Sequence, residues 1–433
     1  MGRLLGSAEK FNDKQVAETL AMLVEYGAKR GATDIHIEPH ERFVLVRYRI
    51  DGALRGLHKL PRQALGTVMA ELKRQAGLDA QEVESPQEGE YTALMGDDRT
   101  EIRLATMPVY GGEKAVLHLS SNPGDPVDLT ELGFWGEGLR TLKSVLANPH
   151  GLITVAGPRH SGVSSTLFSL LKDLNSPLVN IATVETGAKH HLPGINQTYL
   201  PNGLSMQDGL RAVLNQDPNI IMVDNLPDGT TATLAVQAAT TGHMVLAGLH
   251  AQDSAAALLR LRHAGVEPFL LLTGLRASVG QRLVRVLCPD CRERYQPDDE
   301  ERAQLQAAFG LTTPTARKQL HQLEMAAAPV IFGDVRQLNS TPSQITHLWR
   351  PSQRGCEACG HSGYRGRTSL TEVLTNTDNL HKALLAREAM PLSSLQAAVL
   401  KDGFVPMRLD GLVKALRGQT TPSEVLRALS VQA

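Results

Sequence analysis

The chain has few aromatic residues, no excess of charge of either sign and no apolar run long enough to cross a membrane. Lys and Arg number 44 against 45 Asp and Glu, so no net field recruits nucleic acid or an anionic membrane, and no nucleic-acid partner is expected. Residues 1–13 lack the apolar core of a signal peptide, and apolar stretches such as residues 266–275 are too short for a transmembrane helix. These absences favour a cytoplasmic protein.

Cysteine is also scarce, but its spacing is informative. The four cysteines form two CxxC pairs, Cys288 with Cys291 and Cys356 with Cys359. In a reducing compartment this spacing is typical of a tetrahedral Zn²⁺ site rather than of disulfides. Four thiolates leave no open coordination position, so the metal would be structural. The alternative is four buried cysteines without a metal.

The first part of the chain predicts an α+β domain over residues 1–121. Helical periodicity and strand-like alternation of apolar residues follow one another, with helices expected at residues 12–31 and 63–77 and strands at residues 35–50, 101–104 and 115–119. The segment SNPGDPVDLT is rich in Pro, Gly and Asp, which predicts a linker at residues 122–133.

After this linker the pattern changes to short apolar strands that alternate with helical sequence. The expected strands are residues 152–156, 179–184, 219–223 and 244–249. Such alternation predicts a parallel sheet covered by helices on both faces, over residues 134–287. The cysteine segment, residues 288–370, contains a polar stretch without a clear period, and residues 371–433 predict a small helical region.

Residues 157–164, GPRHSGVS, join a predicted strand to a predicted helix in the frame of a GxxxxGK[ST] loop. In such a loop, backbone N–H groups at a helix N-terminus surround phosphates, and a hydroxyl such as that of Ser164 reaches Mg²⁺. The lysine position is Val163, so the cation that neutralises the phosphates is missing. If ATP and Mg²⁺ bind weakly, the expected contacts are Gly157, Pro158, Ser161, Gly162, Ser164, Ser165, Thr166 and Asp224.

Seven runs spread over residues 32–370 together resemble the family of ATPases that drive type II secretion and type IV pilus assembly. They are ATDIHIEPHERFVLVRYRIDGALR, ITVAGPRHSGVSSTLFSLL, LPGINQTYL, GLRAVLNQDPNIIMV, TGHMVLAGLHAQDSAAALLRL, QRLVRVLCPDC and GCEACGHSGYRGRTSL. The resemblance implies a PAS-like N-terminal domain, a RecA-like P-loop domain, a Cys₄ zinc segment and a helical C-terminal cap. It also implies a hexameric ring that works against an inner-membrane platform protein, at the cytoplasmic side of the inner membrane.

Three charged groups of that family's nucleotide site are replaced in this chain. The loop lysine is Val163, the glutamate after the strand NIIMV is Asn225, and the catalytic glutamate is Lys189. These groups bind the γ-phosphate, organise Mg²⁺ and activate water, so their joint loss predicts a subunit that cannot hydrolyse ATP. The resemblance leaves four retained catalytic candidates, Glu185, His243, His250 and Arg103.

Two functions therefore stay open. In the first, the chain is a structural or regulatory pseudo-ATPase of a secretion or pilus motor, in a ring of its own copies or together with an active paralogue. In the second, Asp224 is a magnesium ligand and Lys189 replaces the missing loop cation. The chain would then be an active motor that powers the extraction of pilin-like subunits through the platform protein.

The N-terminal domain contributes further charged residues. Arg103 and the pair Arg47 and Arg49 match family arginines that lie near the nucleotide of the ring, and His118 stands where a second arginine of that region lies. Three other polar residues alternate with apolar ones, so we expect them on the polar face of a sheet rather than in a metal site: Asp34, His36 and Glu38.

Overall fold

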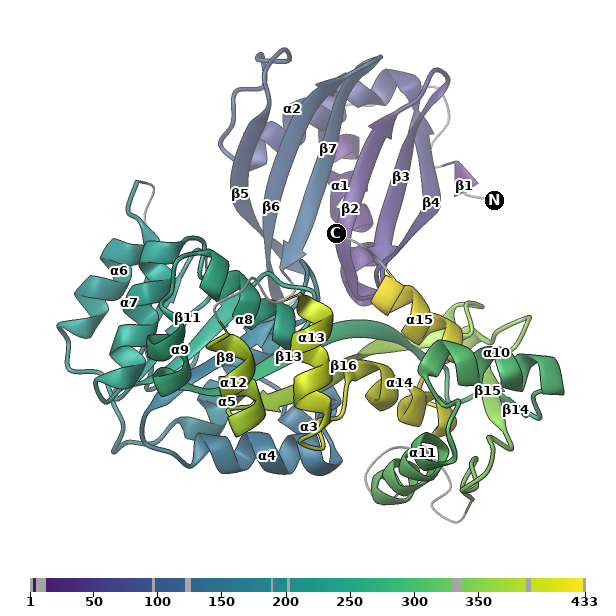
Figure 1. Ribbon diagram of the computed structural model, residues 1–433. Helices are drawn as coiled ribbons and strands as arrows, with labels where there is room; N and C mark the ends of the chain where they lie inside the picture. The colour runs from purple at the N-terminus through teal and green to yellow at the C-terminus, as the bar shows by residue number, and fades with distance from the viewer. Residues whose placement is uncertain are drawn as a thin grey trace. The chain divides into compact units, whose positions relative to one another are not determined.

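The computed structural model describes residues 3–4, 13–95, 98–120, 126–187, 190–200, 203–328, 337–386 and 391–430. The chain forms two compact units, Met1–Gly124 and Asp125–Ala433 (Figure 1). The boundary between them falls inside the predicted linker, whereas the division into five segments stays a prediction. None of the helices in the described ranges is long and apolar enough to cross a lipid bilayer.

The N-terminal unit is a seven-stranded sheet with two helices against one face. Its elements are β1 (Arg3–Leu4), α1 (Asp13–Lys29), β2 (Ala32–Pro39), β3 (Phe43–Ile50), β4 (Ala53–Pro61), η1 (Arg62–Ala64), α2 (Leu65–Gln75), β5 (Gln87–Met95), β6 (Asp98–Val109) and β7 (Gly112–Ser120). The strand order is β1-β4-β3-β2-β7-β6-β5. Alternate strand residues such as Ile35, Val46 and Leu117 are buried with the apolar residues of α1 and α2. This is the α+β domain that the sequence predicts, of the PAS-like type that the family resemblance implies.

The second unit is built on another seven-stranded sheet, in the order β10-β9-β11-β12-β8-β13-β16. Neighbouring strands are parallel except for β16, which is antiparallel to β13. The elements that form this part are α3 (Leu129–Leu132), α4 (Gly136–Leu146), β8 (Gly151–Ala156), α5 (Val163–Leu174), β9 (Ile181–Glu185), β10 (Asn196–Tyr199), α6 (Met206–Leu214), β11 (Ile220–Val223), α7 (Gly229–Thr240), β12 (Met244–Leu249), α8 (Ser254–His263), α9 (Pro268–Gly274), β13 (Leu275–Leu287) and β16 (Tyr364–Thr375).

Helices cover both faces of this sheet, as the continuous apolar strands require. α3, α4 and α5 pack on one face, where Ile153 and Met222 are buried. α6 to α9 pack on the other face, where Leu152 and Ile221 are buried. The predicted RecA-like fold is thus confirmed. Leu129 of α3 belongs to this core, so the end of the predicted linker is part of the second unit.

The sequence left the region between the cysteine pairs open, and the structure places two short strands and two helices there. These elements and the C-terminal helices are β14 (Glu293–Tyr295), α10 (Asp299–Phe309), α11 (Pro314–Ala327), β15 (Leu348–Arg350), η2 (Glu357–Cys359), α12 (Asp378–Leu384), α13 (Leu392–Leu400), α14 (Met407–Leu416) and α15 (Pro422–Ser430). α10, α11, α14 and α15 share one apolar cluster, while α12 and α13 pack against α8 and α9.

One expectation about the tail was wrong. The helical region predicted from residue 371 begins later, because residues 371–375 are the end of β16 and complete the central sheet. Thr371 pairs with Gln281, and Thr375 pairs with Ala277. Both faces of this strand end are covered by protein, so its apolar residues do not alternate and the sequence carries no clear strand signal there.

Candidate nucleotide and metal sites

Residues 157–162 form a loop between β8 and α5, at the place where the sequence predicts a phosphate loop. The Gly157 N–H donates to the carbonyl oxygen of Leu249 at 3.1 Å, which ties the start of the loop to β12. His160 and Gly162 have φ angles of 63° and 87°. Such left-handed residues occur where successive N–H groups form an anion-binding concavity. These two conformations fit the backbone expected of a phosphate loop at the N-terminus of α5, and the nucleotide contacts themselves stay a prediction.

Val163 is the first residue of α5. Its half-buried side chain packs against the apolar cluster that joins α3, α4 and α5 to the sheet. Valine thus contributes packing at the position where a P-loop lysine would contribute charge.

The two acidic candidates lie at the carboxyl ends of adjacent parallel strands. Glu185 ends β9 and is fully buried, and its Oε1 accepts hydrogen bonds from the Thr183 hydroxyl and, at 3.1 Å, from Gln197 Nε2. Asp224 follows β11, and its Oδ2 accepts from the N–H and the hydroxyl of Thr186 at 2.9 and 2.7 Å. Both carboxylates thus accept hydrogen bonds from neighbouring protein groups. Asn225 is half-buried beside Asp224, and Lys189 lies outside the described residues.

The two histidines of the run TGHMVLAGLH lie at opposite edges of the sheet. His250 follows the carboxyl end of β12, which pairs with the end of β8 just before the phosphate loop. His243 precedes β12, and its Nδ1 lies 2.8 Å from the carbonyl oxygen of Pro218. A six-residue strand spans roughly 20 Å. His243 therefore lies at the end of β12 away from the phosphate loop of its own subunit, and its catalytic role stays a prediction.

The polar face of the N-terminal sheet is a network of ion pairs. Asp34 pairs with Arg49 at 3.2 Å and lies 2.7 Å from His118 Nδ1, and Glu38 pairs with Arg47 at 2.6 Å. Both carboxylates form ion pairs with arginine side chains. This arrangement fits the expected polar face of the sheet better than a metal site. The remaining candidate of this unit, Arg103, is exposed and pairs with Glu88 on the neighbouring strand. Its role near a nucleotide stays a prediction.

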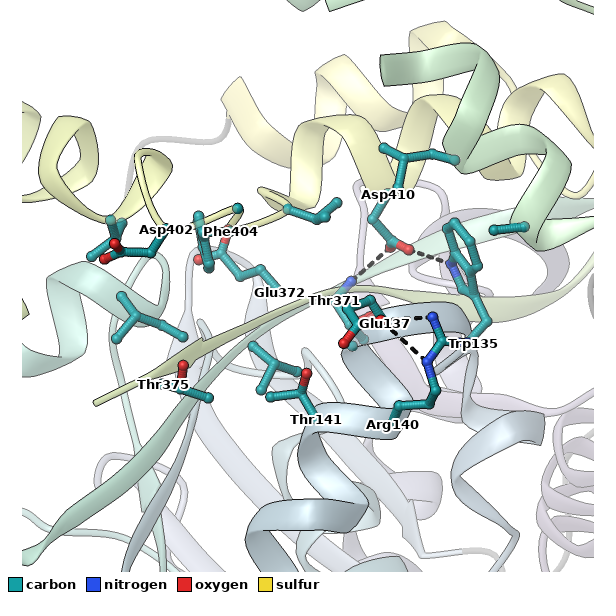
Figure 2. A pocket seen from close by; sticks show the side chains of 18 of the residues that line it. Trp135, Glu137, Arg140, Thr141, Thr371, Glu372, Thr375, Asp402, Phe404 and Asp410 are labelled. Atoms are coloured by element: carbon teal, nitrogen blue, oxygen red, sulfur yellow. Dashed lines mark hydrogen bonds and ion pairs between the residues drawn. The ribbon is translucent and has the colours of Figure 1, made fainter. Parts of the chain in front are cut away.

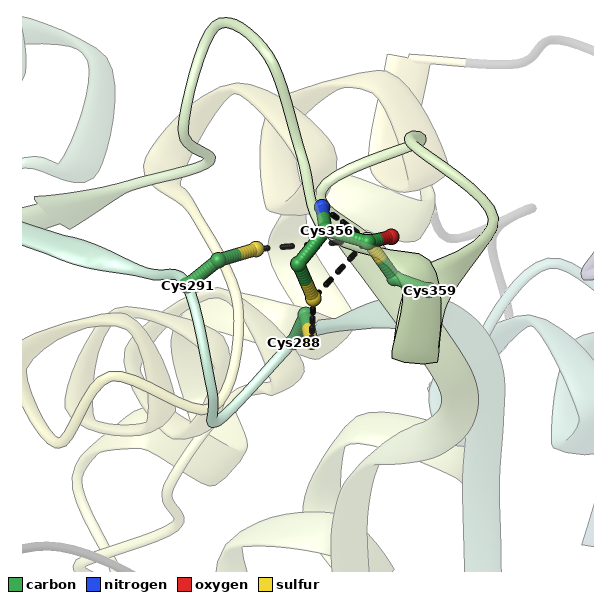
Figure 3. A group of neighbouring side chains, drawn as sticks. All are labelled: Cys288, Cys291, Cys356 and Cys359. Carbon is green, nitrogen blue, oxygen red and sulfur yellow. Dashed lines mark hydrogen bonds between the residues drawn. The ribbon is translucent and has the colours of Figure 1, made fainter.

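The four cysteines come together in space, from two turns about 70 residues apart along the chain (Figure 3). Their sulfur atoms all lie within 4.8 Å of one another. The Sγ–Sγ distances are 3.7 Å for Cys288 to Cys356, 3.9 Å for Cys291 to Cys359 and 3.7 Å for Cys356 to Cys359. A tetrahedral site with Zn–S bonds of about 2.3 Å requires sulfur atoms about 3.8 Å apart. The donor set therefore fits Zn²⁺ in type, number and spacing.

The backbone around Cys359 favours a thiolate. The N–H groups of Cys356 and Gly363 donate to its Sγ at 3.2 and 3.3 Å. Burial opposes ionisation, but hydrogen bonds outweigh it and lower the pKa of Cys359 to about 6, whereas burial raises the pKa of Cys288 and of Cys291. Metal ligands must be deprotonated, so the turn is suited to a metal.

The second unit also contains a cavity of about 380 Å³ that no sequence pattern predicts (Figure 2). It lies between α4, α11, β16 and residues 402–405. On its wall, Asp410 accepts hydrogen bonds from Trp135 Nε1 at 2.5 Å, from Thr371 N at 2.8 Å and from Lys414 Nζ at 2.7 Å. Burial raises the pKa of Asp410 and lowers that of Lys414. These buried groups join α4, β16 and α14.

Sequence reasoning also missed Gln281, on β13. Its side chain contacts the phosphate loop from behind. The residue lies inside the run QRLVRVLCPDC, and its type alone carries no signal of a role because the loop that it touches is more than 100 residues away.

The chain matches the model of the type II/IV secretion system protein family over residues 9–427. It is 39% identical over 410 residues to the type II secretion system protein E of Dickeya dadantii, which covers 94% of this chain and 74% of that protein. It is 37% identical over 397 residues to the type IV pilus assembly ATPase PilB of Thermus thermophilus, with coverage of 91% and 41%.

The fold is also similar to that of a solved structure, the ATPase DotB of Legionella pneumophila. The TM-score is 0.66 at 17% identity, and the match covers 98% of both chains. At this identity the likeness concerns the fold alone. The sequence matches over nearly the whole length leave one conclusion: this chain belongs to the type II/IV secretion system protein family.

Proposed function

We propose that this chain is a hydrolysis-deficient subunit of a type II secretion or type IV pilus assembly motor, with a structural or regulatory role. The observation that carries the proposal is Val163, which packs against an apolar cluster at the first position of α5. A bound triphosphate would lack the cation that balances its β- and γ-phosphates. Asn225 can hold water by hydrogen bonds but cannot take up its proton as a carboxylate can.

The competing function is an active motor, and Asp224 is the residue that favours it. Its position at the end of β11 is that of a magnesium ligand in a P-loop site. However, its Oδ2 already accepts two hydrogen bonds from Thr186. Binding of Mg²⁺ through this oxygen would compete with these two hydrogen bonds, which costs free energy.

The test measures nucleotide binding by calorimetry and phosphate release by the pure full chain, in matched buffers with and without Mg²⁺. We expect no magnesium-dependent release above that of Asp224→Ala, and none from Val163→Lys, because Asn225 and Lys189 remain. Steady release that Asp224→Ala abolishes would refute the proposal and establish the motor function. Binding of ATP without release would leave a nucleotide-dependent scaffold.

A gain of function provides the matched positive control. The triple variant Val163→Lys, Asn225→Glu and Lys189→Glu restores the three charges that the family resemblance implies. If their loss is what prevents hydrolysis, this variant should release phosphate at least about 10²-fold faster than the unchanged chain, since single transition-state contacts are worth that much.

We further propose that the chain works in a ring, either a hexamer of its own copies or a mixed ring with an active paralogue. This ring would lie on the cytoplasmic side of the inner membrane and act on a platform protein. The support is its similarity to a type II secretion system protein E over 94% of its length. Light scattering of the pure chain, alone and mixed with a full-activity paralogue, tests this arrangement. A strict monomer under both conditions would contradict it.

We also propose that Cys288, Cys291, Cys356 and Cys359 hold a structural Zn²⁺. The sulfur spacing supports a tetrahedral site. The metal would join the turn after β13 to the turn that precedes β16, and so hold this end of the antiparallel pair together.

A further inference from the structure

Gln281 lies in the middle of β13 and is 1% exposed. Its Nε2 donates to the carbonyl oxygen of Ser161, the residue before Gly162, at 3.0 Å. Its Oε1 accepts from the hydroxyl of Thr166, in the first turn of α5, at 2.6 Å. One amide thus binds both the end of the phosphate loop and the helix that the loop begins, and all three residues are buried.

The two glycines of the loop fit around the same residue. A Cβ atom on Gly157 would lie 2.6 Å from the carbonyl oxygen of Gln281, and a Cβ atom on Gly162 would lie 2.7 Å from its Nε2. Either approach is closer than real Cβ contacts allow. At Gly162 the Gln281 side-chain amide therefore occupies the space where a side chain would stand, whereas at Gly157 that space is taken first by the Ser161 hydroxyl and then by the Gln281 backbone.

The loop conformation needs such support. His160 is a non-glycine residue with positive φ, a conformation that costs an L-residue free energy and persists only when surrounding contacts hold it. The hydrogen bonds of Gln281 are made to protein groups on both sides of Gly162. They do not require phosphate or Mg²⁺.

We propose that Gln281 is the positioning residue of the phosphate loop, which it holds in its nucleotide-accepting shape from behind without touching the ligand. The shape is then set by β13 before any ligand arrives. The inference holds for an active and for an inactive site alike, so its failure and the failure of the proposed hydrolysis deficiency are separate outcomes.

Hydrogen exchange of the full chain without nucleotide tests this role, with peptides that cover residues 159–166. In Gln281→Leu, which removes both hydrogen bonds at similar volume, loop amides should exchange about 10-fold faster or more, since a lost buried bond shifts local opening by that order. Thr166→Val removes one of the two bonds and should give a smaller rise. Amides of β11 and β12 should exchange as in the unchanged chain.

Asn376→Ala is the matched control. The Asn376 amide likewise makes two hydrogen bonds, to the backbone carbonyl oxygens of Leu272 and Leu275, but at the far end of the same β13–β16 pair. Asn376→Ala should destabilise this far end of the β13–β16 pair and leave the hydrogen exchange of the phosphate loop unchanged.

Two outcomes would overturn the proposal. One is loop exchange that does not change in either Gln281→Leu or Thr166→Val. The other is a rise that is equal in the loop, in β11 and in β12, which would indicate a general loss of stability. If Gln281→Leu does not fold, the comparison of Thr166→Val with Asn376→Ala decides the question by the same criteria.

Discussion

The buried ion pair beside the cavity allows a prediction whose size follows from the structure. Lys414 is 0% and Asp410 3% exposed, and their charged atoms are 2.7 Å apart. Lys414→Met keeps a chain of similar length but leaves Asp410 with only the hydrogen bonds from Trp135 and Thr371. Removing one partner of a buried pair costs about 3–5 kcal/mol, because the other charge stays buried.

Protonation limits this loss. An aspartate with an unfolded pKa of about 3.9 can be neutralised at pH 7 for about 4 kcal/mol. Burial already raises the pKa of Asp410, and loss of the ammonium of Lys414 raises it further. We therefore expect Lys414→Met to lower the free energy of unfolding by about 3–4 kcal/mol at pH 7.

The loss should depend on pH with a defined sign. A carboxyl group whose pKa is higher in the folded state binds more protons there, so its contribution to stability falls as pH rises through the interval between the unfolded and folded pKa values. The difference in the free energy of unfolding between Lys414→Met and the unchanged chain should accordingly shrink as the pH is lowered from 7 toward 4, by up to about 1.4 kcal/mol for each pH unit.

Urea denaturation followed by tryptophan fluorescence is the suitable assay. The chain has two tryptophans, Trp135 and Trp349, and both lie in the second unit. Arg140→Met is the control, since Arg140 pairs with Glu137 on the same cavity wall but both side chains are more than 60% exposed. It should cost less than about 0.5 kcal/mol. An equal, pH-independent loss in both variants would refute the reasoning.

Three further predictions concern acid stability, the loop and the metal. The pKa of Glu424 is lowered to about 2, since Arg285 and Arg427 outweigh its burial. The contribution of the Glu424 carboxylate to the free energy of unfolding is therefore present above pH 4.5 and is lost as the pH falls toward 2. Glu424→Gln should remove this acid-dependent part, about 2 kcal/mol in urea titrations, a value that is reduced because Arg427 is exposed. His160→Val should lower the melting temperature, because a β-branched residue fits poorly at positive φ, whereas His160→Gly should not. Cys356→Ser should reduce the zinc content measured by mass spectrometry and lower the melting temperature, and a chelator should lower it in the unchanged chain but not in this variant.

Local patterns were sufficient for much of the fold. The apolar runs of β8, β11 and β12 and the alternation in β2 and β3 predict buried and half-buried strands, because side-chain periodicity depends only on neighbouring residues. The turn glycines and the CxxC pairs are equally local. The end of β16, residues 371–375, escaped prediction because both of its faces are covered, which removes the alternation.

The position of His243 is a feature that local patterns do not give. The run TGHMVLAGLH places two histidines close in sequence, but the strand between them carries His243 to the other edge of the sheet. The rise of a six-residue strand could have given that distance, once the run was assigned as a single strand.

By itself, the sequence determined the family, the two kinds of sheet, the frame of the phosphate loop and the pairing of the four cysteines into one candidate metal site, because each depends on residue type and short spacing. Only the tertiary structure decided what supports them. Gln281 meets Ser161 across 120 residues, and Trp135 meets Asp410 across 275. Such pairs form because packed strands and helices exclude water from polar groups, which must then find partners wherever the fold brings them.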